Sequence, residues 1–411
     1  MIKKVGVEQI APGMYVHDFN CSWLEHPFLQ NSVLLKTDDD VKKVREFGVR
    51  ELFIDTSKGA DVADAMTLEE HKRESIEEMH RVFEPKRVGA LNLVEYADEL
   101  PKAKKVKQEA QKVITDIMAD VKMGKQVVVE KAEHVVSTMV DSVFRNVDAL
   151  TSLSRIKDAD QYLFMHSVNV CVLIISFCRH TGIEREIINK VGVGALLHDV
   201  GKTKLPPAIL NKPARLTEKE FEVMQKHPGL SRELLLETDR IPEEAIQVAY
   251  QHHERFDGTG YHERLKGDAV SQFGQMASVA DVYDAITTDR VYHRGMGPAE
   301  AIRKIFEWSK NQFKEEIAHK FIKCVGIYPV GTLVLLDGGL LAVVSEPGRE
   351  SMLSPVVRAV YDAKKRRHIK PVDIDLSSRV GSGEGEGIIG YEDPARHGIN
   401  PLDYLDLHGI F

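Results

Sequence analysis

The sequence predicts a mainly α-helical protein, in which a helical bundle follows a small α+β domain and precedes a short extension with β-strands. Long stretches with a 3.6-residue apolar period fill much of residues 97–325, as expected for helices that bury one face. Short apolar runs separated by turn residues fill residues 1–56, which is typical of strands. A hairpin pattern appears after residue 326.

The first domain is expected to span residues 1–130 and to end in linker helices. Residues 14–16 and 49–54 read as strands, and residues 41–47 fit one short helix. The charged segment 57–85 is typical of a solvated helix or linker. Residues 97–150 should form two or three bridging helices. No phosphoacceptor or cofactor motif is visible, so we expect a regulatory or interaction role.

The second domain is expected to span residues 131–325 and to be a helical bundle. Helix length and period predict helices at residues 162–180, 184–197, 218–237 and 243–251. The extension, residues 326–380, should contain a hairpin whose strands at 332–336 and 340–344 flank the turn Asp337-Gly338-Gly339. The Gly-rich run that begins at Gly381 predicts a flexible tail over residues 381–411.

Composition excludes several functional classes. The chain has 411 residues and a net charge of −8, and proteins that wrap nucleic acid usually carry a basic excess. The four cysteines form no CxxC pair, which suits a reducing compartment and excludes a cysteine-based zinc knuckle. The N-terminus lacks the apolar core of a signal peptide, and no apolar run approaches the ~20 residues needed to span a bilayer. We therefore expect a cytoplasmic protein without membrane insertion.

Histidines and aspartates form five landmarks along the bundle. They are His166, the pair His198-Asp199, His227, the pair His252-His253, and Asp281. Each one alone is more typical of a packed core or helix-end residue. Together they recur at intervals of 25 to 32 residues, each long enough for one helix and one connection, so all five can return to the same end of a bundle. Imidazole and carboxylate are ligands of divalent transition metals, and helix bundles hold metal pairs in this way.

The motifs around these landmarks carry a family resemblance. They read LLHDVGK at residues 196–202, HHERFDGTGYH at 252–262 and ADVYDAITTDR at 280–290. With them, and with residues 209–228, the region 150–325 resembles the HD-GYP family, which consists of metal-dependent phosphodiesterases of the HD superfamily that hydrolyse cyclic di-GMP. Residues 1 to about 130 resemble the uncharacterised domain often found before HD-GYP domains. The resemblance implies an HD-type bundle as the catalytic domain.

The resemblance also implies two divalent metal ions. One would take His166, His198, Asp199 and Asp281, and the other would share Asp199 and take His227, His252 and His253. Iron and manganese are the foremost expectations, while zinc, nickel and cobalt also accept this ligand set. The glutamate that holds a third metal in some family members is replaced by Tyr162, so we expect two metals.

The implied reaction uses a metal-bridging hydroxide, which attacks phosphorus while the 3′ oxygen leaves. The product would be linear pGpG, with further cleavage to GMP left open. Asp199 and Lys202 are the expected catalytic residues, since Lys202 follows the His-Asp pair by about one helical turn and would stabilise the developing negative charge. Lys202, Tyr261, Arg290 and Arg294 are the expected substrate contacts.

This chain departs from the family pattern at two sites. His262 stands where the family has Pro, and the segment after Asp289 carries Val291 and His293 at positions that are usually Pro and basic. These departures leave two alternatives open: a cyclic di-GMP sensor or docking module with weak or lost hydrolysis, and a hydrolase of another nucleotide, with 3′,3′-cyclic GMP-AMP as the nearest case. A diguanylate cyclase (GGDEF) domain and a second copy of the chain are the expected protein partners.

Overall fold

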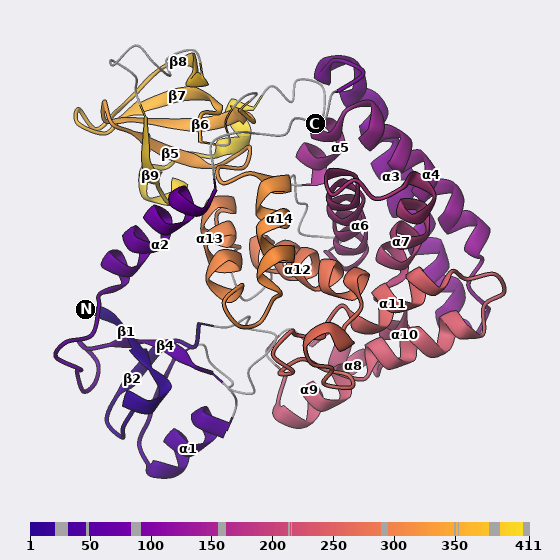
Figure 1. Ribbon diagram of the computed structural model, residues 1–411, viewed down its shortest axis with the longest axis horizontal. Coiled ribbons are helices and arrows are strands. Elements are labelled where there is room, and N and C mark those ends of the chain that lie inside the picture. The colour runs from indigo at the N-terminus through magenta and orange to yellow at the C-terminus, as the bar shows by residue number, and fades with distance from the viewer. Residues whose placement is uncertain are drawn as a thin grey trace. The chain divides into compact units, whose positions relative to one another are not determined.

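A computed structural model describes residues 1–20, 32–46, 49–83, 92–154, 162–212, 214, 216–288, 295–348, 351, 353–377 and 387–405 (Figure 1). The chain divides into two compact units. The first comprises Met1–Val82 and Leu205–Gln225, and the second comprises Phe83–Lys204 and Lys226–Phe411. Within the described part of the chain, no helix is both long enough and apolar enough to cross a membrane.

The first unit contains an antiparallel sheet with strand order β1-β4-β2-β3. The strands are β1 (Ile2–Gly6), β2 (Tyr15–Asp18), β3 (Val33–Leu34) and β4 (Glu51–Asp55), and the helices are α1 (Asp38–Glu46), α2 (Leu68–Val82), α8 (Pro207–Leu210) and α9 (Glu218–Met224). Its core packs Val44 of α1 against Val16 and Leu52 of the sheet. The expected strand at 49–54 and helix at 41–47 correspond to β4 and α1.

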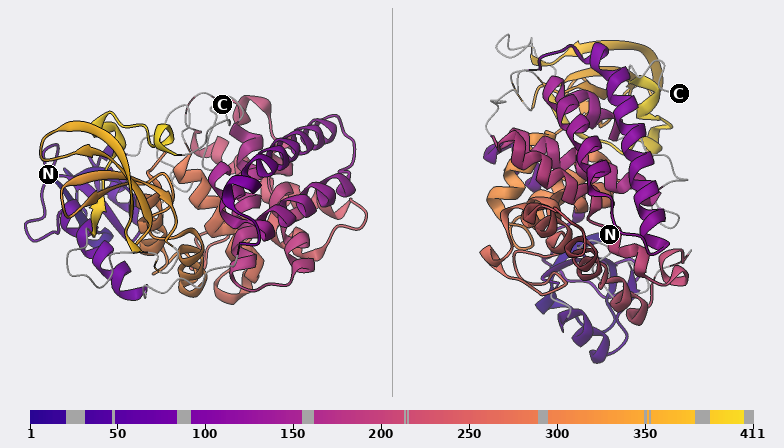
Figure 2. Two further views of the ribbon diagram at one scale, coloured as in Figure 1. Left: turned by 90° about the horizontal axis from the view of Figure 1, so that it is seen from above. Right: turned by 90° about the vertical axis from the view of Figure 1, so that its right-hand side faces the viewer.

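Helices dominate the second unit (Figures 1 and 2). They are α3 (Tyr96–Lys122), α4 (Val129–Arg145), α5 (Val147–Ser154), α6 (Tyr162–His180), α7 (Arg185–Leu197), α10 (His227–Leu236), α11 (Glu243–Gln251), α12 (Gln272–Thr287), α13 (Pro298–Trp308) and α14 (Glu315–Val325), with a 3₁₀ turn η3 (Val200–Lys204) after α7. Helix α12 is buried along its length from Gly274 to Ile286 and contacts α6, α11, α13 and α14. A helix that is buried on every side lies at the centre of its bundle.

One expected helix is divided in the structure. The periodic segment 218–237 forms α9 and α10, which are separated by Gln225 and Lys226. Pro228 lies in the first turn of α10, where its missing N–H costs nothing, whereas inside a continuous helix it would remove a hydrogen bond. The division places His227 at the first position of a helix.

A five-stranded antiparallel sheet follows the helices, with order β8-β7-β6-β5-β9. The strands are β5 (Leu333–Leu336), β6 (Leu340–Glu346), β7 (Val356–Asp362), β8 (Arg367–Asp375) and β9 (Ile388–Tyr391). The pairing of Leu335 with Leu341 confirms the expected hairpin.

The region expected to be a flexible tail is structured in part. Strand β9 pairs with β5, and Ile399 belongs to the core of the sheet. The glycine-rich run is confined to residues 381–387. Residues 381–386 of this run lie outside the described residues. The next residues, Ile388-Ile389-Gly390-Tyr391, are apolar enough to complete a sheet. The prediction of a loose tail over all of 381–411 was therefore wrong for 387–405.

Candidate metal centre

Seven side chains with metal-ligand chemistry meet in the second unit, and most of them stand at helix ends. His198 and Asp199 directly follow α7, His227 begins α10, and His252 and His253 directly follow α11, whereas His166 and Asp281 lie within α6 and α12. All are buried, with residue exposures of 6% or less. The structure thus brings together every residue that the sequence resemblance suggested as a metal ligand. The His-Asp pair lies in the turn between α7 and η3, and not inside a helix.

One group of ligand atoms comes from His166, His198 and Asp199. Their ligand atoms lie within 4.8 Å of one another. Oδ2 of Asp199 is 3.3 Å from Nε2 of His198 and 3.9 Å from Nε2 of His166. These separations leave space for a cation between the imidazoles and the carboxylate.

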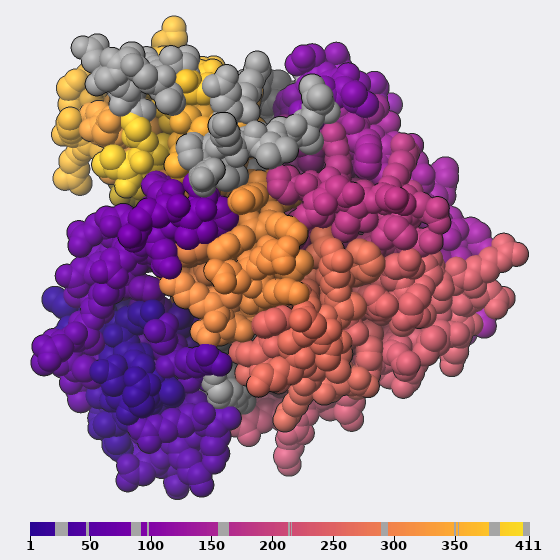
Figure 3. Space-filling view, in the orientation of Figure 1, coloured from indigo at the N-terminus to yellow at the C-terminus, as the bar shows by residue number. Residues whose placement is uncertain are grey.

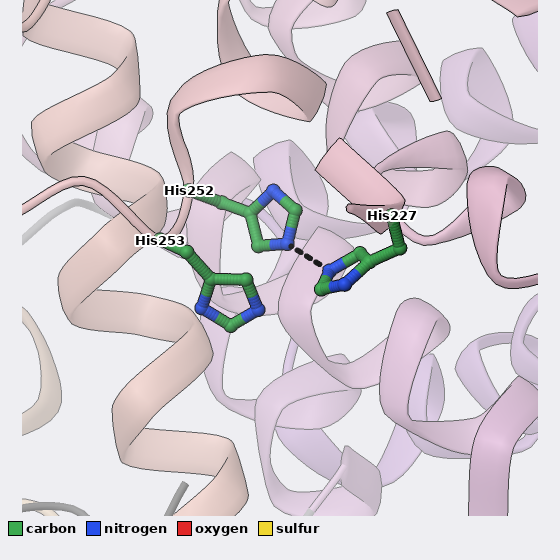
Figure 4. Close-up of side chains that lie close together, drawn as sticks. All are labelled: His227, His252 and His253. Atoms are coloured by element: carbon green, nitrogen blue, oxygen red, sulfur yellow. Dashed lines mark hydrogen bonds between the residues drawn. The ribbon is translucent and has the colours of Figure 1, made fainter. Parts of the chain in front are cut away.

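A second group comes from His227, His252 and His253, whose imidazoles converge in Figure 4. Nε2 of His227 lies 3.2 Å from Nε2 of His252. Burial and the neighbouring imidazoles hold the pKa of His252 well below its usual value, and the same causes lower the pKa of His253. Neutral imidazoles offer lone pairs, which is the form that binds metals.

Asp199 faces both groups. Its Oδ1 is 3.3 Å from Nε2 of His227, while its Oδ2 points to His198. Burial alone would raise the pKa of this carboxyl, but its interactions with His198 and the charge of Lys202 outweigh burial and hold the pKa well below its ordinary value. An ionised carboxylate with one oxygen toward each group is suited to bridging two cations.

Asp281 also contacts both groups. Its Oδ1 is 2.9 Å from Nε2 of His166, and its Oδ2 is 3.6 Å from Nδ1 of His253. The family assignment gave Asp281 to one metal only. In the structure its two oxygens lie between the two histidine groups, on the α12 side of the centre.

Backbone carbonyls fix the orientation of two histidines. Nδ1 of His198 donates to the carbonyl of Ala195 over 2.8 Å, and Nδ1 of His252 donates to the carbonyl of Ala249 over 2.9 Å. A carbonyl only accepts, so Nδ1 carries the proton and Nε2 presents its lone pair to the centre. This arrangement of a histidine with an outer hydrogen-bond partner is usual for metal ligands.

Three buried polar atoms in this centre have no hydrogen-bond partner among the described residues. They are Nε2 of His198, Oδ1 of Asp199 and Oδ2 of Asp281. A buried polar atom left without a partner costs free energy. Bound cations would satisfy all three atoms, so the donor set fits divalent metal ions.

Of the remaining expected site residues, two lie beside the centre and two lie outside the described residues. Lys202 lies in η3 and its Nζ donates to Oδ2 of Asp199 over 2.6 Å. The ring of Tyr261 lies 4.6 Å from that of His253. Arg290 and Arg294, together with Val291 and His293, lie outside the described residues.

Two supporting residues extend the centre. Oδ2 of Asp284 accepts a hydrogen bond from Nδ1 of His166 over 2.7 Å, and Oδ1 of Asp284 accepts from Nδ2 of Asn169 over 3.3 Å. Neither residue was among the site residues predicted from the sequence. Asp284 follows Asp281 by three positions, and Asn169 follows His166 by three. Because residues three apart share a helix face, this spacing was a usable signal.

The chain resembles known families and proteins over most of its length. Residues 2–132 match a domain of unknown function, DUF3391, and residues 143–317 match the HD domain. "Cyclic di-GMP phosphodiesterase PA4108" of Pseudomonas aeruginosa is 36% identical over 406 residues, which cover 98% of this chain and 95% of that protein. "3'3'-cGAMP-specific phosphodiesterase 2" of Vibrio cholerae is 37% identical over 122 residues, 29% of this chain and 21% of that one. A solved structure, the HDG"Y"P protein Bd1817 from Bdellovibrio bacteriovorus, has 16% identity and a TM-score of 0.47 over 78% of this chain and 98% of its own.

Proposed function

The chain belongs to the HD-GYP family, and from this premise we propose that it is a metal-dependent phosphodiesterase that hydrolyses cyclic di-GMP to linear pGpG. The observation that carries the proposal is the position of Asp199, a buried carboxylate with one oxygen toward His198 and the other toward His227. The relative named as a cyclic di-GMP phosphodiesterase aligns with nearly the whole chain.

The proposed centre holds two divalent cations, iron or manganese. His166 and His198 would hold one and His227, His252 and His253 the other, with Asp199 shared between them. Asp281 completes the first site in the family assignment, and the contact of its Oδ2 with His253 gives it a second role at the neighbouring site. When bound, the cations supply charge neutralisation for the phosphate and activation of the attacking water.

The chain's own residues supply orientation and charge. The carbonyls of Ala195 and Ala249 and the carboxylate of Asp284 keep three imidazoles turned toward the centre. Lys202, held beside Asp199, presents an ammonium group where negative charge develops on the phosphoryl oxygens. Tyr261 beside His253 offers an aromatic face and a hydroxyl to the nucleotide.

The proposal is tested by turnover of cyclic di-GMP with anaerobically purified protein loaded with Fe(II) or Mn(II). We expect linear pGpG as the first product, and its further conversion to GMP is read from the same time course. Asp199→Ala serves as the inactive control. Absence of product above this control in a metal-replete sample overturns the proposal.

A second candidate is hydrolysis of 3′,3′-cyclic GMP-AMP, since a Vibrio cholerae relative is named for that substrate. Its match covers only 29% of this chain, so cyclic di-GMP is the better-supported substrate. Equimolar competition between the two dinucleotides separates the candidates by the ratio of their kcat/KM values. Tight binding of both without turnover would instead support a sensor or docking role. A GGDEF-domain partner, a homodimer and a cytoplasmic location stay predictions.

A further inference from the structure

The loop that follows the His252-His253 doublet is built around one buried carboxylate. Glu254 is 2% exposed. Its Oε1 accepts hydrogen bonds from the backbone N–H groups of His262 and Glu263 over 3.0 and 2.8 Å, and its Oε2 accepts from that of Leu265 over 2.9 Å. A buried carboxylate is stable only when donors surround it, and here backbone amides provide them.

The first of these donors exists because of a departure from the family pattern. The family has Pro where this chain has His262, and Pro has no backbone N–H. The hydrogen bond from His262 to Glu254 therefore cannot form in the usual Gly-Tyr-Pro loop. In this chain His262 adds a third amide to the carboxylate.

The side chain of His262 makes a second connection. Gly229 lies two residues after His227, and a Cβ at Gly229 would stand 2.7 Å from the imidazole of His262. The same imidazole lies edge-on to Tyr250, with ring centres 5.4 Å apart. His262 therefore packs directly on the first turn of α10, the helix that begins with His227.

The residue held by this loop is Tyr261. Its N–H donates to the carbonyl of His253 over 3.1 Å, and its ring lies 4.6 Å from His253 and 6.3 Å from His227. The preceding Gly260 has no room for a side chain, because a Cβ there would lie 2.4 Å from the backbone nitrogen of Arg255. The loop thus closes back onto the histidine doublet and leaves Tyr261 facing the centre. The salmon-to-orange part of the surface in Figure 3 belongs to described residues of the second unit between about 240 and 325.

We propose that His262 is a positioning residue for substrate binding. Its N–H completes the amide cradle around Glu254 and its imidazole packs on Gly229, so that Tyr261 is held beside the His227 and His253 side of the centre, ready to contact the cyclic dinucleotide. The inference rests on the proposed function for its substrate, whereas the cradle itself is a property of the folded chain. The N–H that His262 supplies in place of the usual Pro adds one hydrogen bond to the loop.

The test compares His262→Pro, which removes both the N–H and the imidazole, with His262→Ala, which removes only the imidazole. Amide hydrogen exchange is measured on the full-length protein in a peptide covering residues 261–265. We expect His262→Pro to speed exchange at Glu263 and Leu265 by about tenfold, since a charge-assisted bond is lost, and His262→Ala to speed it less. Glu254→Gln should speed exchange at the same amides.

Kinetics provide the second readout. If Tyr261 contacts the substrate, His262→Pro should raise KM for cyclic di-GMP about tenfold at nearly unchanged kcat and metal content, because uniform binding is lost. Unchanged exchange and unchanged KM in His262→Pro overturn the inference. Faster exchange at Glu263 and Leu265 in Glu254→Gln but not in His262→Pro also overturns it. If His262→Pro fails to fold, unchanged exchange and KM in His262→Ala overturn it in the same way. If the wild type does not turn over cyclic di-GMP but the exchange results are as expected, the proposed function is overturned. The role of His262 in the amide cradle around Glu254 is then still supported.

Discussion

His166 lies between two aspartates of one helix: its Nδ1 donates to Asp284 over 2.7 Å, and its Nε2 lies 2.9 Å from Asp281. Both carboxylates belong to α12, one helical turn apart. Carboxylates only accept, so Asp284 fixes the direction of the ring and leaves Nε2 directed at the ligand group of Asp199 and His198. Asn169 in turn donates to Asp284 over 3.3 Å.

Replacement of Asp284 by Ala should weaken metal binding. His166 would lose the partner that sets its orientation, and outer hydrogen-bond partners of this kind are worth about 10- to 100-fold in metal affinity or activity. The measurement is competition of Mn(II) between the protein and a chelator of known affinity. Asp239→Ala, at an exposed position of the same unit, is the matched control. Equal metal affinity in the two variants would contradict the role of Asp284.

Replacement of Lys202 by Ala should lower kcat with little change in metal content. Its Nζ lies 2.6 Å from Asp199, and loss of a group aimed at developing charge typically costs about 10²–10³ in kcat. Lys202→Arg should recover only part of the rate, because a planar guanidinium does not reproduce a compact ammonium. Lys204 is exposed in the same 3₁₀ turn, so Lys204→Ala should keep full activity. A rate for Lys202→Ala within twofold of the wild type would remove Lys202 from the mechanism.

Removal of metal should lower thermal stability as well as abolish turnover. Ligands that bind only the folded state stabilise it, by about 2.7 kcal/mol at 100 times the dissociation constant. We expect the melting temperature of chelator-treated protein to rise on addition of Mn(II) and that of Asp199→Ala to stay constant. The comparison is made by calorimetry at one protein concentration. An equal rise in the variant would show that the stabilising cations bind elsewhere.

Periodic and local features could be predicted from the sequence. The expected helix at 162–180 corresponds to α6 and that at 243–251 to α11, because both have a strong apolar period and clear ends. Recurrence of His and Asp at intervals of about one helix and one connection predicted their convergence, since such an interval returns the chain to the same end of a bundle. The separation of α9 from α10 was not predicted, because the apolar period continues through residues 218–237. The period does not reflect the effect of Pro228, which is favoured only in the first turn of a helix.

Long-range polar contacts could not be predicted in the same way. Asp284 meets His166 from a position 118 residues away. Its spacing from Asp281 places it on the same helix face, but the spacing does not tell which side chain it contacts. The cradle of Glu254 uses backbone N–H groups, which carry no side-chain signature. Strand β9 was missed because Gly-rich residues 381–387 obscured the short apolar run after them.

A buried carboxylate joins α3 to α4 and should contribute to stability. Glu99 is fully buried, with Oε1 accepting from Oγ of Ser142 and Nη2 of Arg145, both over 2.8 Å, and Oε2 accepting from Nε of Arg145 over 2.7 Å. Burial alone would raise the pKa of Glu99, but the hydrogen bonds from Arg145 and Ser142 outweigh burial and lower it below the usual 4.5. The ionised form is therefore favoured by folding.

A carboxyl whose pKa is lower in the folded state stabilises the protein fully above its unfolded pKa, and this contribution is lost as the pH falls through the folded pKa. Glu99→Gln should lower the free energy of unfolding by about 2 kcal/mol at pH 7, because Arg145 loses its ionic partner. The loss is limited because the Arg145 side chain is about one-third exposed to water. The difference from the wild type should shrink steadily as the pH is lowered below about 4. Urea unfolding at pH 7 and at pH 3.5 measures it, with the exposed Glu130→Gln of α4 as control. A difference that is the same at both pH values would mean that Glu99 acts through packing, since only an ionised carboxylate links its stabilisation to protons.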